Sequence, residues 1–331
     1  MKKYNLFGFA VILFSILFSQ ALYAQSIFDA LLGKNDMSAK DKLRVKYIEG
    51  DSDVPEEILL INISGVIQEE NDDGMPMRPS KNIIEELKKD LEVLTKRNSV
   101  KGALIEINSP GGEVTCSDIM FHLIKKANKE TGKPIVAIIG SMGASGAYYV
   151  ACGANKIYAH PTSIIGSIGV IMQSINIERL SQMIGVKPVV LKSERTPMKD
   201  ILSPYRELTE QEKESLLLIV NNIYDRFINI VSESRELPKE DVIKLADGRI
   251  YTADKAKETA LIDEIGYRED AFKKTCELAG IEKAALVKRI VKKGLGEFLG
   301  ELAEINSGLP SLKNELKMLL ETSGSPQIML R

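Results

Sequence analysis

The sequence predicts an α/β fold, since apolar strand patterns alternate with amphipathic helix patterns from Ile58 onward. Two strand patterns, 58–65 and 102–108, flank a helix pattern at 80–97. A further helix pattern then leads to a third strand at 134–140. Strand–helix–strand units of this length form right-handed crossovers between parallel strands. We therefore expect these strands to lie side by side in one parallel sheet.

The individual elements follow one another with short connections. The strand "ILLINISG" precedes the helix "SKNIIEELKKDLEVLTKR", which leads to the strand "GALIEIN". The loop "SPGG" then opens a helix from about Thr115 to Lys126. The strand "PIVAIIG" runs directly into the glycine-rich stretch "SMGASGAYY". Both glycine-rich turns are thus predicted at the ends of strands, where α/β proteins collect ligands and catalytic groups.

A long helix is predicted further along the chain, over residues 209–231. It opens with Thr209 three residues before Glu212, which is the pattern of a capping box. Apolar residues recur on one face at helical spacing, so this face is expected to pack on another element. The residues of that face are Leu216, Ile219, Ile223, Phe227 and Ile230.

Composition and charge exclude several classes of function. A chain of 331 residues with 44% apolar and 27% charged side chains can bury a sizeable core, in one large domain or two small ones. The formal net charge of -2, with both signs intermixed, gives no electrostatic reason to bind nucleic acid. The three cysteines show neither a disulfide framework nor zinc spacing, and are expected as buried apolar residues; they are Cys116, Cys152 and Cys276. We predict no metal and no organic cofactor.

Residues 1–24 form an export segment. Lys2 and Lys3 precede an apolar run from residue 6 to residue 18, as in a cleaved signal peptide or an uncleaved membrane anchor. The sequence leaves both possibilities open: a signal peptide cleaved after Ala24, or an anchor that is retained. The remainder is expected outside the cytoplasm, because the positive end stays inside. It would be membrane-associated at the periplasmic face of the inner membrane, or soluble in the periplasm after cleavage.

The rest of the chain divides into a linker, a folded domain and an extension. Residues 25–55 are polar and mixed and are predicted to form a linker, and residues 56–283 the α/β domain. Residues 284–331 contain amphipathic stretches and are predicted to form a helical C-terminal extension. This extension would cover the domain as a pair of helices, or contact a partner subunit or the membrane surface.

The two glycine-rich turns suggest nucleophilic catalysis. In "INSPGGE", Gly111 and Gly112 follow the rigid Pro110 and let backbone N–H groups face outward before a helix, where an anion can bind. In "SMGASGAYY", small residues surround the hydroxyl of Ser145. Bulky side chains there would block a substrate from the serine and from the backbone. Side by side, the turns would supply a nucleophile and donors for a developing oxyanion.

The base that activates such a serine is not a histidine in an obvious position. His122 lies in a predicted helix and His160 precedes Pro161 at a predicted strand end. A nucleophile elbow is also absent, because Ala147 stands where that motif requires glycine. Lys199, in the loop "SERTPMKDILSPYRELT", can serve if burial lowers its pKa toward neutrality.

The motifs named above resemble those of the signal peptide peptidase A family, bacterial membrane Ser/Lys peptidases, in its short single-repeat form. The resemblance covers about residues 57–280. It is carried by "INSPGG", "SMGASGAYYVACGANKIYAHPTSIIGSIGV", "KDILSP" and "DGRIYTADKAKETALIDEIG". It implies a crotonase or Clp-protease type of fold, a spiral of ββα units, and homo-oligomeric rings whose active sites face an enclosed cavity.

The resemblance also implies roles for particular residues. Ser145 would be the nucleophile, Lys199 the general base, and Ser167 in "GSIGV" the hydroxyl that holds the lysine. The backbone N–H groups of Gly112 and Gly146 would form the oxyanion hole. The implied function is a serine endopeptidase that cleaves apolar peptides at the membrane, such as released signal peptides. A dry pocket that keeps the lysine neutral would itself favour apolar side chains.

Two other functions are compatible with such a fold. A crotonase-like acyl-CoA enzyme shares the pair of backbone donors, but the export segment removes the chain from cytoplasmic acyl-CoA. An exported, non-catalytic scaffold that binds membrane proteins would have no need of both Ser145 and Lys199. Labelling Ser145 with a fluorophosphonate would separate the peptidase from the scaffold.

Overall fold

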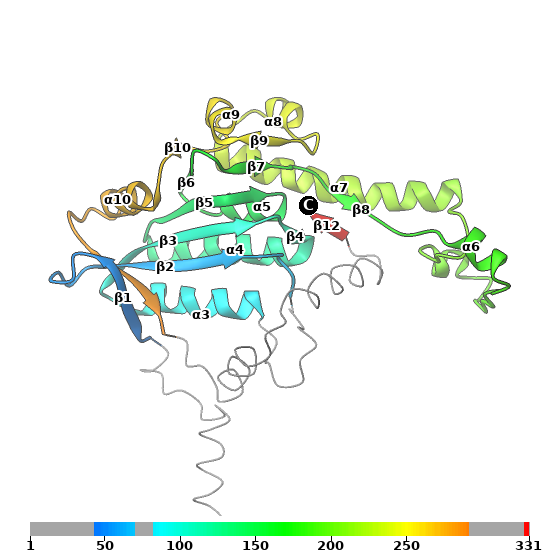
Figure 1. Ribbon diagram of the computed structural model, residues 1–331, viewed down its shortest axis with the longest axis horizontal. Coiled ribbons are helices and arrows are strands. Elements are labelled where there is room, and N and C mark those ends of the chain that lie inside the picture. Colours follow the sequence, from blue (N-terminus) through cyan, green and yellow to red (C-terminus); the bar gives the residue numbers. More distant parts are fainter. Residues whose placement is uncertain (1–42, 70–81, 291–327, 331) are drawn as a thin grey trace, which may run out of the picture.

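A nine-stranded sheet forms the centre of the protein in the computed structural model, which describes residues 43–69, 82–290 and 328–330 (Figure 1). Its central strands are parallel, as the alternation of strands and helices predicted. They lie in the order β11 (Ala285–Arg289), β2 (Glu57–Ser64), β3 (Val100–Ser109), β5 (Ile135–Ala144), β6 (Lys156–Ala159) and β10 (Glu264–Ile265).

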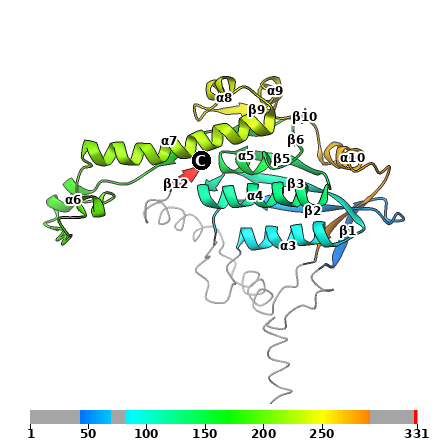
Figure 2. The same cartoon turned by 180° about the vertical axis from the view of Figure 1, so that it is seen from behind.

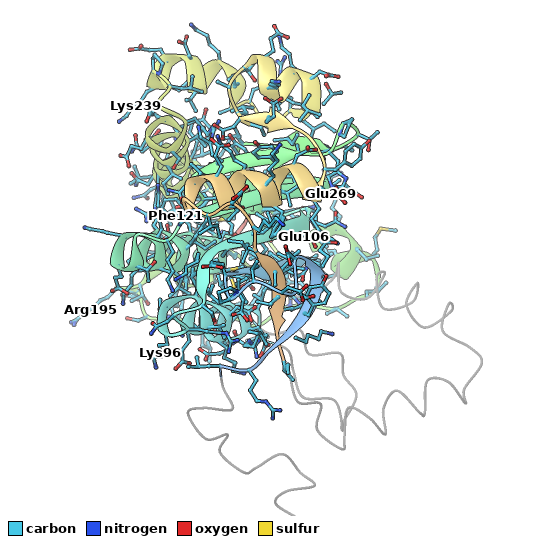
Figure 3. All side chains as sticks on the ribbon, turned by 90° about the vertical axis from the view of Figure 1, so that its left-hand side faces the viewer. Lys96, Glu106, Phe121, Arg195, Lys239 and Glu269 are labelled. Atoms are coloured by element: carbon cyan, nitrogen blue, oxygen red, sulfur yellow. The ribbon has the colours of Figure 1, made fainter. Side chains whose placement is uncertain are left out.

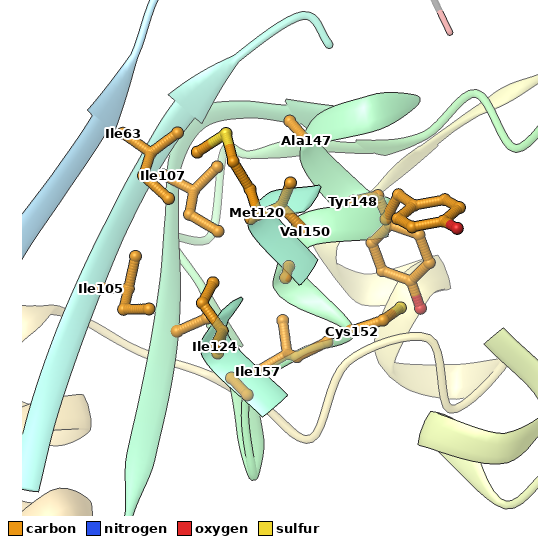
Figure 4. Close-up of a cluster of buried hydrophobic side chains, with 14 of the residues drawn as sticks. Ile63, Ile105, Ile107, Met120, Ile124, Ala147, Tyr148, Val150, Cys152 and Ile157 are labelled. Atoms are coloured by element: carbon orange, nitrogen blue, oxygen red, sulfur yellow. The ribbon is translucent and has the colours of Figure 1, made fainter. Parts of the chain in front are cut away.

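Helices cover both faces of this sheet. The helices α3 (Ile83–Lys96), α4 (Val114–Thr131) and α5 (Gly146–Ala151) lie on one face, and α10 (Arg268–Leu278) on the other (Figure 1). Alternate residues of each strand serve the two faces: Ile105 and Ile107 of β3 join the larger core, and Leu104 joins the core under α10. Figure 4 shows part of the larger core around Met120 and Ile124 of α4. The strands are continuous apolar runs because both of their sides are buried.

The sheet extends beyond both predicted ends of the folded domain. The strand β1 (Val45–Gly50), within the predicted linker, pairs antiparallel with β11, within the predicted extension. Arg289 of β11 donates hydrogen bonds of 2.5 Å to both Asp90 and Glu86 of α3. The strand β1 was missed because it is only half-buried and mixes charged with apolar residues. The predicted segment 1–24 and most of the extension lie outside the described residues.

A second, smaller sheet lies beside the ends of the central strands. It has the order β4 (Gly112–Glu113), β12 (Ile328–Leu330) and β8 (Ile171–Met172), with β12 antiparallel to both neighbours. The backbone of β12 pairs Leu330 with Gly112 and Ile328 with Met172. A segment near the C-terminus thus lies against the turn that follows β3 (Figure 1).

An arm projects from the body of the protein (Figure 1). It contains α6 (Glu178–Met183), the 3-10 turn Pro197–Asp200 and the first half of α7 (Glu210–Arg235). The helix α7 begins at the predicted capping box of Thr209 and Glu212. Its predicted apolar face packs only in its second half, where Phe227 is buried, whereas Ile219 is 43% exposed on the arm.

The remaining elements complete the edge of the sheet beyond β5. They are β7 (Ile164–Gly166), which pairs with β5 and with β9 (Ile250–Thr252), and the short helices α8 (Lys239–Leu245) and α9 (Ala253–Glu258). Charged side chains such as Lys96, Lys239 and Glu269 point outward (Figure 3). Among the described residues, no helix combines the length and apolar character needed to cross a membrane.

Candidate active site

Ser145 lies where β5 ends and α5 begins. Its backbone has φ 54° and ψ -122°, a conformation that residues other than glycine rarely adopt. Two hydrogen bonds hold it there: Ser145 N donates to Gly166 O at 2.7 Å, and Tyr149 N donates to Ser145 O at 3.0 Å. The strand and the helix therefore fix an unusual backbone geometry at this one serine.

The hydroxyl of Ser145 is buried and has no hydrogen-bond partner among the described residues. Leaving a buried hydroxyl unpaired costs about 1–3 kcal/mol. Proteins tolerate such groups mainly where the group has a chemical task or meets a ligand. The unpaired oxygen is therefore the observation that most distinguishes Ser145 from an ordinary small residue at a helix start.

The turn after β3 places the backbone of Gly112 next to Ser145. Gly111 has φ 100°, and its N–H donates to Ser109 Oγ at 3.1 Å. Two backbone hydrogen bonds hold Ile67 against this turn. Ile67 N donates to Gly111 O at 2.9 Å, and Glu113 N donates to Ile67 O at 2.7 Å. A Cβ at Gly112 would lie 2.0 Å from Ile67 O, so only glycine fits.

Gly146 brings the two turns into contact. A Cβ at Gly146 would lie 2.4 Å from Ser117 Oγ and 3.3 Å from Gly112 N. The N–H of Gly146 belongs to the first turn of α5, where helical N–H groups have no partner within the helix. The backbone of both glycines thus lies beside Ser145, as the two glycine-rich turns predicted.

Ser167 lies next to Ser145 through strand pairing. Ala144 of β5 pairs with Gly166 of β7, so the two serines follow paired residues of neighbouring parallel strands. Ser167 has φ 48°, and its N–H donates to Arg249 O at 2.8 Å. The structure therefore brings three of the predicted site features together: Ser145, the glycine turns and Ser167.

Lys199 lies apart from these residues, on the arm. It belongs to the 3-10 turn Pro197–Asp200 and its side chain is exposed. The next residue, Asp200, anchors this turn by accepting hydrogen bonds from Lys192 at 2.5 Å and from Arg206 at 3.0 Å. Figures 1 and 2 show the arm extending away from α5. Within one chain the lysine is neither buried nor bonded to Ser145 Oγ.

Other nucleophiles and bases are poorly placed or unreactive. Burial raises the pKa of the Cys116 thiol to about 12, with Glu113 adding to the shift. Burial also raises the pKa of Cys152 to about 12. His122 is exposed on α4, and His160 packs its ring against Tyr267 with centroids 5.5 Å apart. In the described part of the chain, no group of three or more His, Cys, Asp or Glu could hold a metal.

Some residues at the site were not foreseen from the sequence. Ile67 fixes the Gly112 turn through backbone bonds, and any residue with a normal N–H and C=O could do so. Ser117 packs beneath Gly146, with its hydroxyl donating to Glu113 O at 2.8 Å. The run "QIML", which contains β12, follows a turn-like "SGSP" and could have been predicted as a strand, but not its pairing with β4.

Comparisons with known proteins identify the family. The model for peptidase family S49 matches residues 127–282. A provisionally named protease of Synechocystis is 36% identical over 234 residues, which cover 67% of this chain and 82% of that protein. A provisionally named protease of Methanocaldococcus jannaschii is 38% identical over 208 residues, covering 63% of this chain and 66% of the relative.

A provisionally named signal peptide peptidase SppA of Enterococcus faecium is 35% identical over 218 residues, covering 65% of this chain and 61% of the relative. The chain therefore spans less than two thirds of the length of the relatives from Methanocaldococcus and Enterococcus. Among solved structures, a ClpP1 mutant from Listeria monocytogenes matches with a TM-score of 0.41 and 17% identity, over 65% of this chain and 94% of that one.

The fold is thus mixed α/β with a largely parallel sheet, and its site joins a strained serine to two glycine turns. The extent of the Synechocystis match is enough to assign the family. The chain belongs to peptidase family S49, the signal peptide peptidase A family.

Proposed function

We propose that the protein is a serine endopeptidase in which Ser145 is the nucleophile. The observation that carries this proposal is the unpaired, buried Ser145 Oγ beside the backbone of Gly112 and Gly146. Membership of a peptidase family supports the same reaction. An acyl-CoA enzyme would need no serine at this position, and a scaffold would have no reason to keep an unpaired hydroxyl there.

The reaction would proceed by acyl transfer. Ser145 Oγ attacks the carbonyl carbon of the scissile bond while a base takes its proton. The negative charge that develops on the carbonyl oxygen is met by the N–H groups of Gly112 and Gly146. The protonated base then gives its proton to the leaving amine as the C–N bond breaks. Water hydrolyses the resulting ester and restores the serine.

We infer that Lys199 is the base and that it reaches Ser145 of a second copy of the chain. The arm that carries Lys199 is unusually apolar for a free surface. Its exposed fractions are 84% for Met183, 86% for Val189 and 95% for Leu191. Contact between copies would bury these side chains and desolvate Lys199, which favours the neutral amine that a base requires. Ser167, next to Ser145, would then accept a hydrogen bond from the arriving lysine.

The substrate would be an extended apolar peptide. The backbone of β12 lies antiparallel between β4 and β8, and its Leu330 pairs directly with Gly112. A peptide can occupy the same place by adding a strand, since its backbone would make the bonds that β12 makes. Signal peptides released at the membrane have the required length and apolarity. The periplasmic face of the inner membrane is the location that an export segment at residues 1–24 would give.

A complementation assay tests the proposed site. Ser145→Ala and Lys199→Ala should each abolish cleavage of an apolar fluorogenic peptide while the circular dichroism spectrum stays unchanged. Mixing the two after dissociation and reassembly should restore about a quarter of wild-type activity, because about one site in four would combine an intact Ser145 with an intact Lys199. Lys199→Arg should fail as Lys199→Ala does, since a guanidinium cannot accept a proton.

Three outcomes would contradict the proposal in different ways. An active Ser145→Ala variant would remove Ser145 as the nucleophile. An active Lys199→Arg variant would remove Lys199 as the base. Individually inactive variants that stay inactive in the mixture would exclude a lysine supplied by a second copy.

A further inference from the structure

The helices α4, α5 and α7 meet at one carboxylate oxygen outside the candidate active site. Tyr149 of α5 donates its hydroxyl to Asp118 Oδ1 of α4 at 2.5 Å. Arg226 of α7 donates to the same oxygen from Nη2 at 2.6 Å and from Nε at 2.9 Å. Figure 2 shows α7 passing along α5 and α4. We call Asp118, Tyr149 and Arg226 the three-helix cluster.

Each of these helices carries a different part of the proposed site. The helix α4 begins two residues after Gly112, and α5 begins directly after Ser145. The helix α7 runs from the arm that carries Lys199 back to the body of the protein. The cluster therefore connects the helix that follows the Gly112 turn, the helix that follows Ser145 and the helix that comes from the arm.

The contacts around Tyr149 leave little freedom for its ring. The residue is 1% exposed, and its ring packs between Phe121 of α4 and Phe227 of α7, with centroid distances of 5.5 and 5.0 Å. Tyr149 N also donates to Ser145 O, one helical turn back. The side chain held by the cluster therefore belongs to the helical turn whose backbone is bonded to Ser145.

The electrostatics of the cluster keep the tyrosine hydroxyl as a donor. Burial, with a further contribution from the hydrogen bond to Asp118, raises the pKa of Tyr149 well above its usual value. The hydrogen bond to Asp118 likewise raises the pKa of Arg226. The tyrosine hydroxyl therefore stays protonated and the guanidinium stays charged over the range in which a peptidase assay is run, so both continue to donate to Asp118.

We propose that Asp118, Tyr149 and Arg226 are positioning residues. They hold Ser145 against the Gly112 turn and fix its position relative to the helix α7 that comes from the arm. This inference rests on the proposed function of Ser145. The cluster touches no reacting atom in that mechanism. Its effect would be on the rate of attack, because small displacements of a nucleophile from its acceptor reduce rate without removing substrate contacts.

Tyr148 offers a matched control on the same helix. Its ring is also fully buried, and its hydroxyl donates to Leu261 O at 2.6 Å on the other side of α5. Tyr149→Phe and Tyr148→Phe each remove one buried hydroxyl and keep the ring. They differ in that only Tyr149→Phe breaks the contact among the three helices.

The test compares kcat and KM for the two variants on an apolar fluorogenic peptide. Tyr149→Phe should lower kcat by about 10- to 100-fold and leave KM within about twofold, whereas Tyr148→Phe should keep kcat within about threefold of wild type. Arg226→Met should repeat the kcat loss, and Arg226→Lys should restore part of it by keeping a cation. Arg226 is more than half exposed, so its variants should fold.

A second measurement tests the positioning role without depending on whether Ser145 is the nucleophile. Hydrogen exchange at the amides of residues 146–149 should be faster in Tyr149→Phe than in Tyr148→Phe, whether or not Ser145 is catalytic. Equal kcat values in the two tyrosine variants, a loss confined to KM, or equal exchange at these amides would overturn the positioning role. An active Ser145→Ala variant would instead remove the proposed function and leave the exchange result standing.

Discussion

Gly112 has no space for a side chain, so a single methyl group is enough to test the proposed role of its N–H in binding the oxyanion. An alanine Cβ would lie 2.0 Å from Ile67 O, so the backbone of one of them must move. Gly112→Ala should lower kcat/KM by about 10²- to 10³-fold, as expected when one oxyanion donor is displaced. Thermal unfolding should also begin at a lower temperature, since the bonds to Ile67 weaken.

Gly140 provides the matched control for that substitution. A Cβ there would meet its nearest atom, Asn108 Cβ, at 3.5 Å, which is ordinary contact. Gly140→Ala should keep both activity and melting temperature close to wild type. Full activity in Gly112→Ala would show that the Gly112 turn has no part in the reaction.

The sequence predicted that Ser145, Ser167 and the two glycine turns lie together, which the structure shows, but Lys199 lies apart on the arm. Ser145 and Gly112 follow strands β5 and β3, and neighbouring parallel strands bring their carboxyl ends together. The role of Ile67 was not visible, because it acts through its backbone. The three-helix cluster was not visible either, because its side chains come from three helices and have no common spacing in the sequence.

At the scale of elements, the loop of Lys199 depends on a charge network at the start of α7. Arg206 donates to Asp200 at 3.0 Å and to Glu212 at 2.5 Å. Arg206 lowers the pKa of Glu212 to about 2, with the backbone of Thr209 adding to the effect. Hydrogen bonds from Arg206 and Lys192 lower the pKa of Asp200 below its usual range.

Acid should therefore loosen this loop. A carboxylate whose pKa is depressed on folding stabilises the fold above its ordinary pKa, and that stabilisation is lost as the pH falls toward the folded value. Hydrogen exchange over residues 192–212, corrected for intrinsic rates, should be less protected at about pH 2.5 than at pH 6. Arg206→Gln should show the same loss already at pH 6.

Arg249 offers the control for the acid experiment. It forms an exposed pair with Asp247 away from the arm, so Arg249→Gln should leave exchange over residues 192–212 unchanged. Equal protection of this segment at both pH values in the wild type would mean that the charge network does not hold the loop.

Strands and helices with strong periodicity were predicted at nearly their observed positions, and weaker elements were missed. The predicted strand 102–108 and helix 80–97 correspond to β3 and α3, within a few residues. The strand β1 was assigned to a linker because edge strands are partly exposed and mix polar with apolar residues. The apolar face of α7 was predicted to pack on another element, and it does so in its second half, whereas its first half lies on the arm.

For the whole molecule, the apolar arm is the part that a second copy should cover. Met183 and Leu191 are almost fully exposed, so replacing both with glutamine should not destabilise the single chain. The double variant should lose self-association, measured by light scattering after size-exclusion chromatography. Peptide turnover should fall with it, because Lys199 would no longer reach a neighbouring Ser145.

Ile243 on α8 is the control for the arm variant. It is 52% exposed, on a helix away from the arm, so Ile243→Gln should keep both the assembly and the turnover. An arm variant that stays assembled and fully active would show that the contact between copies lies elsewhere.

The strand β12, paired between β4 and β8, should respond to dilution differently from a contact between copies. The strand belongs to the same chain as β4 and β8, so its local concentration beside those strands does not depend on how much protein is present. The proposed contact between the arm of one copy and the body of another does depend on the protein concentration. Diluting the protein should thus separate the copies and leave β12 in place, whereas a peptide in excess should compete with β12 at any protein concentration.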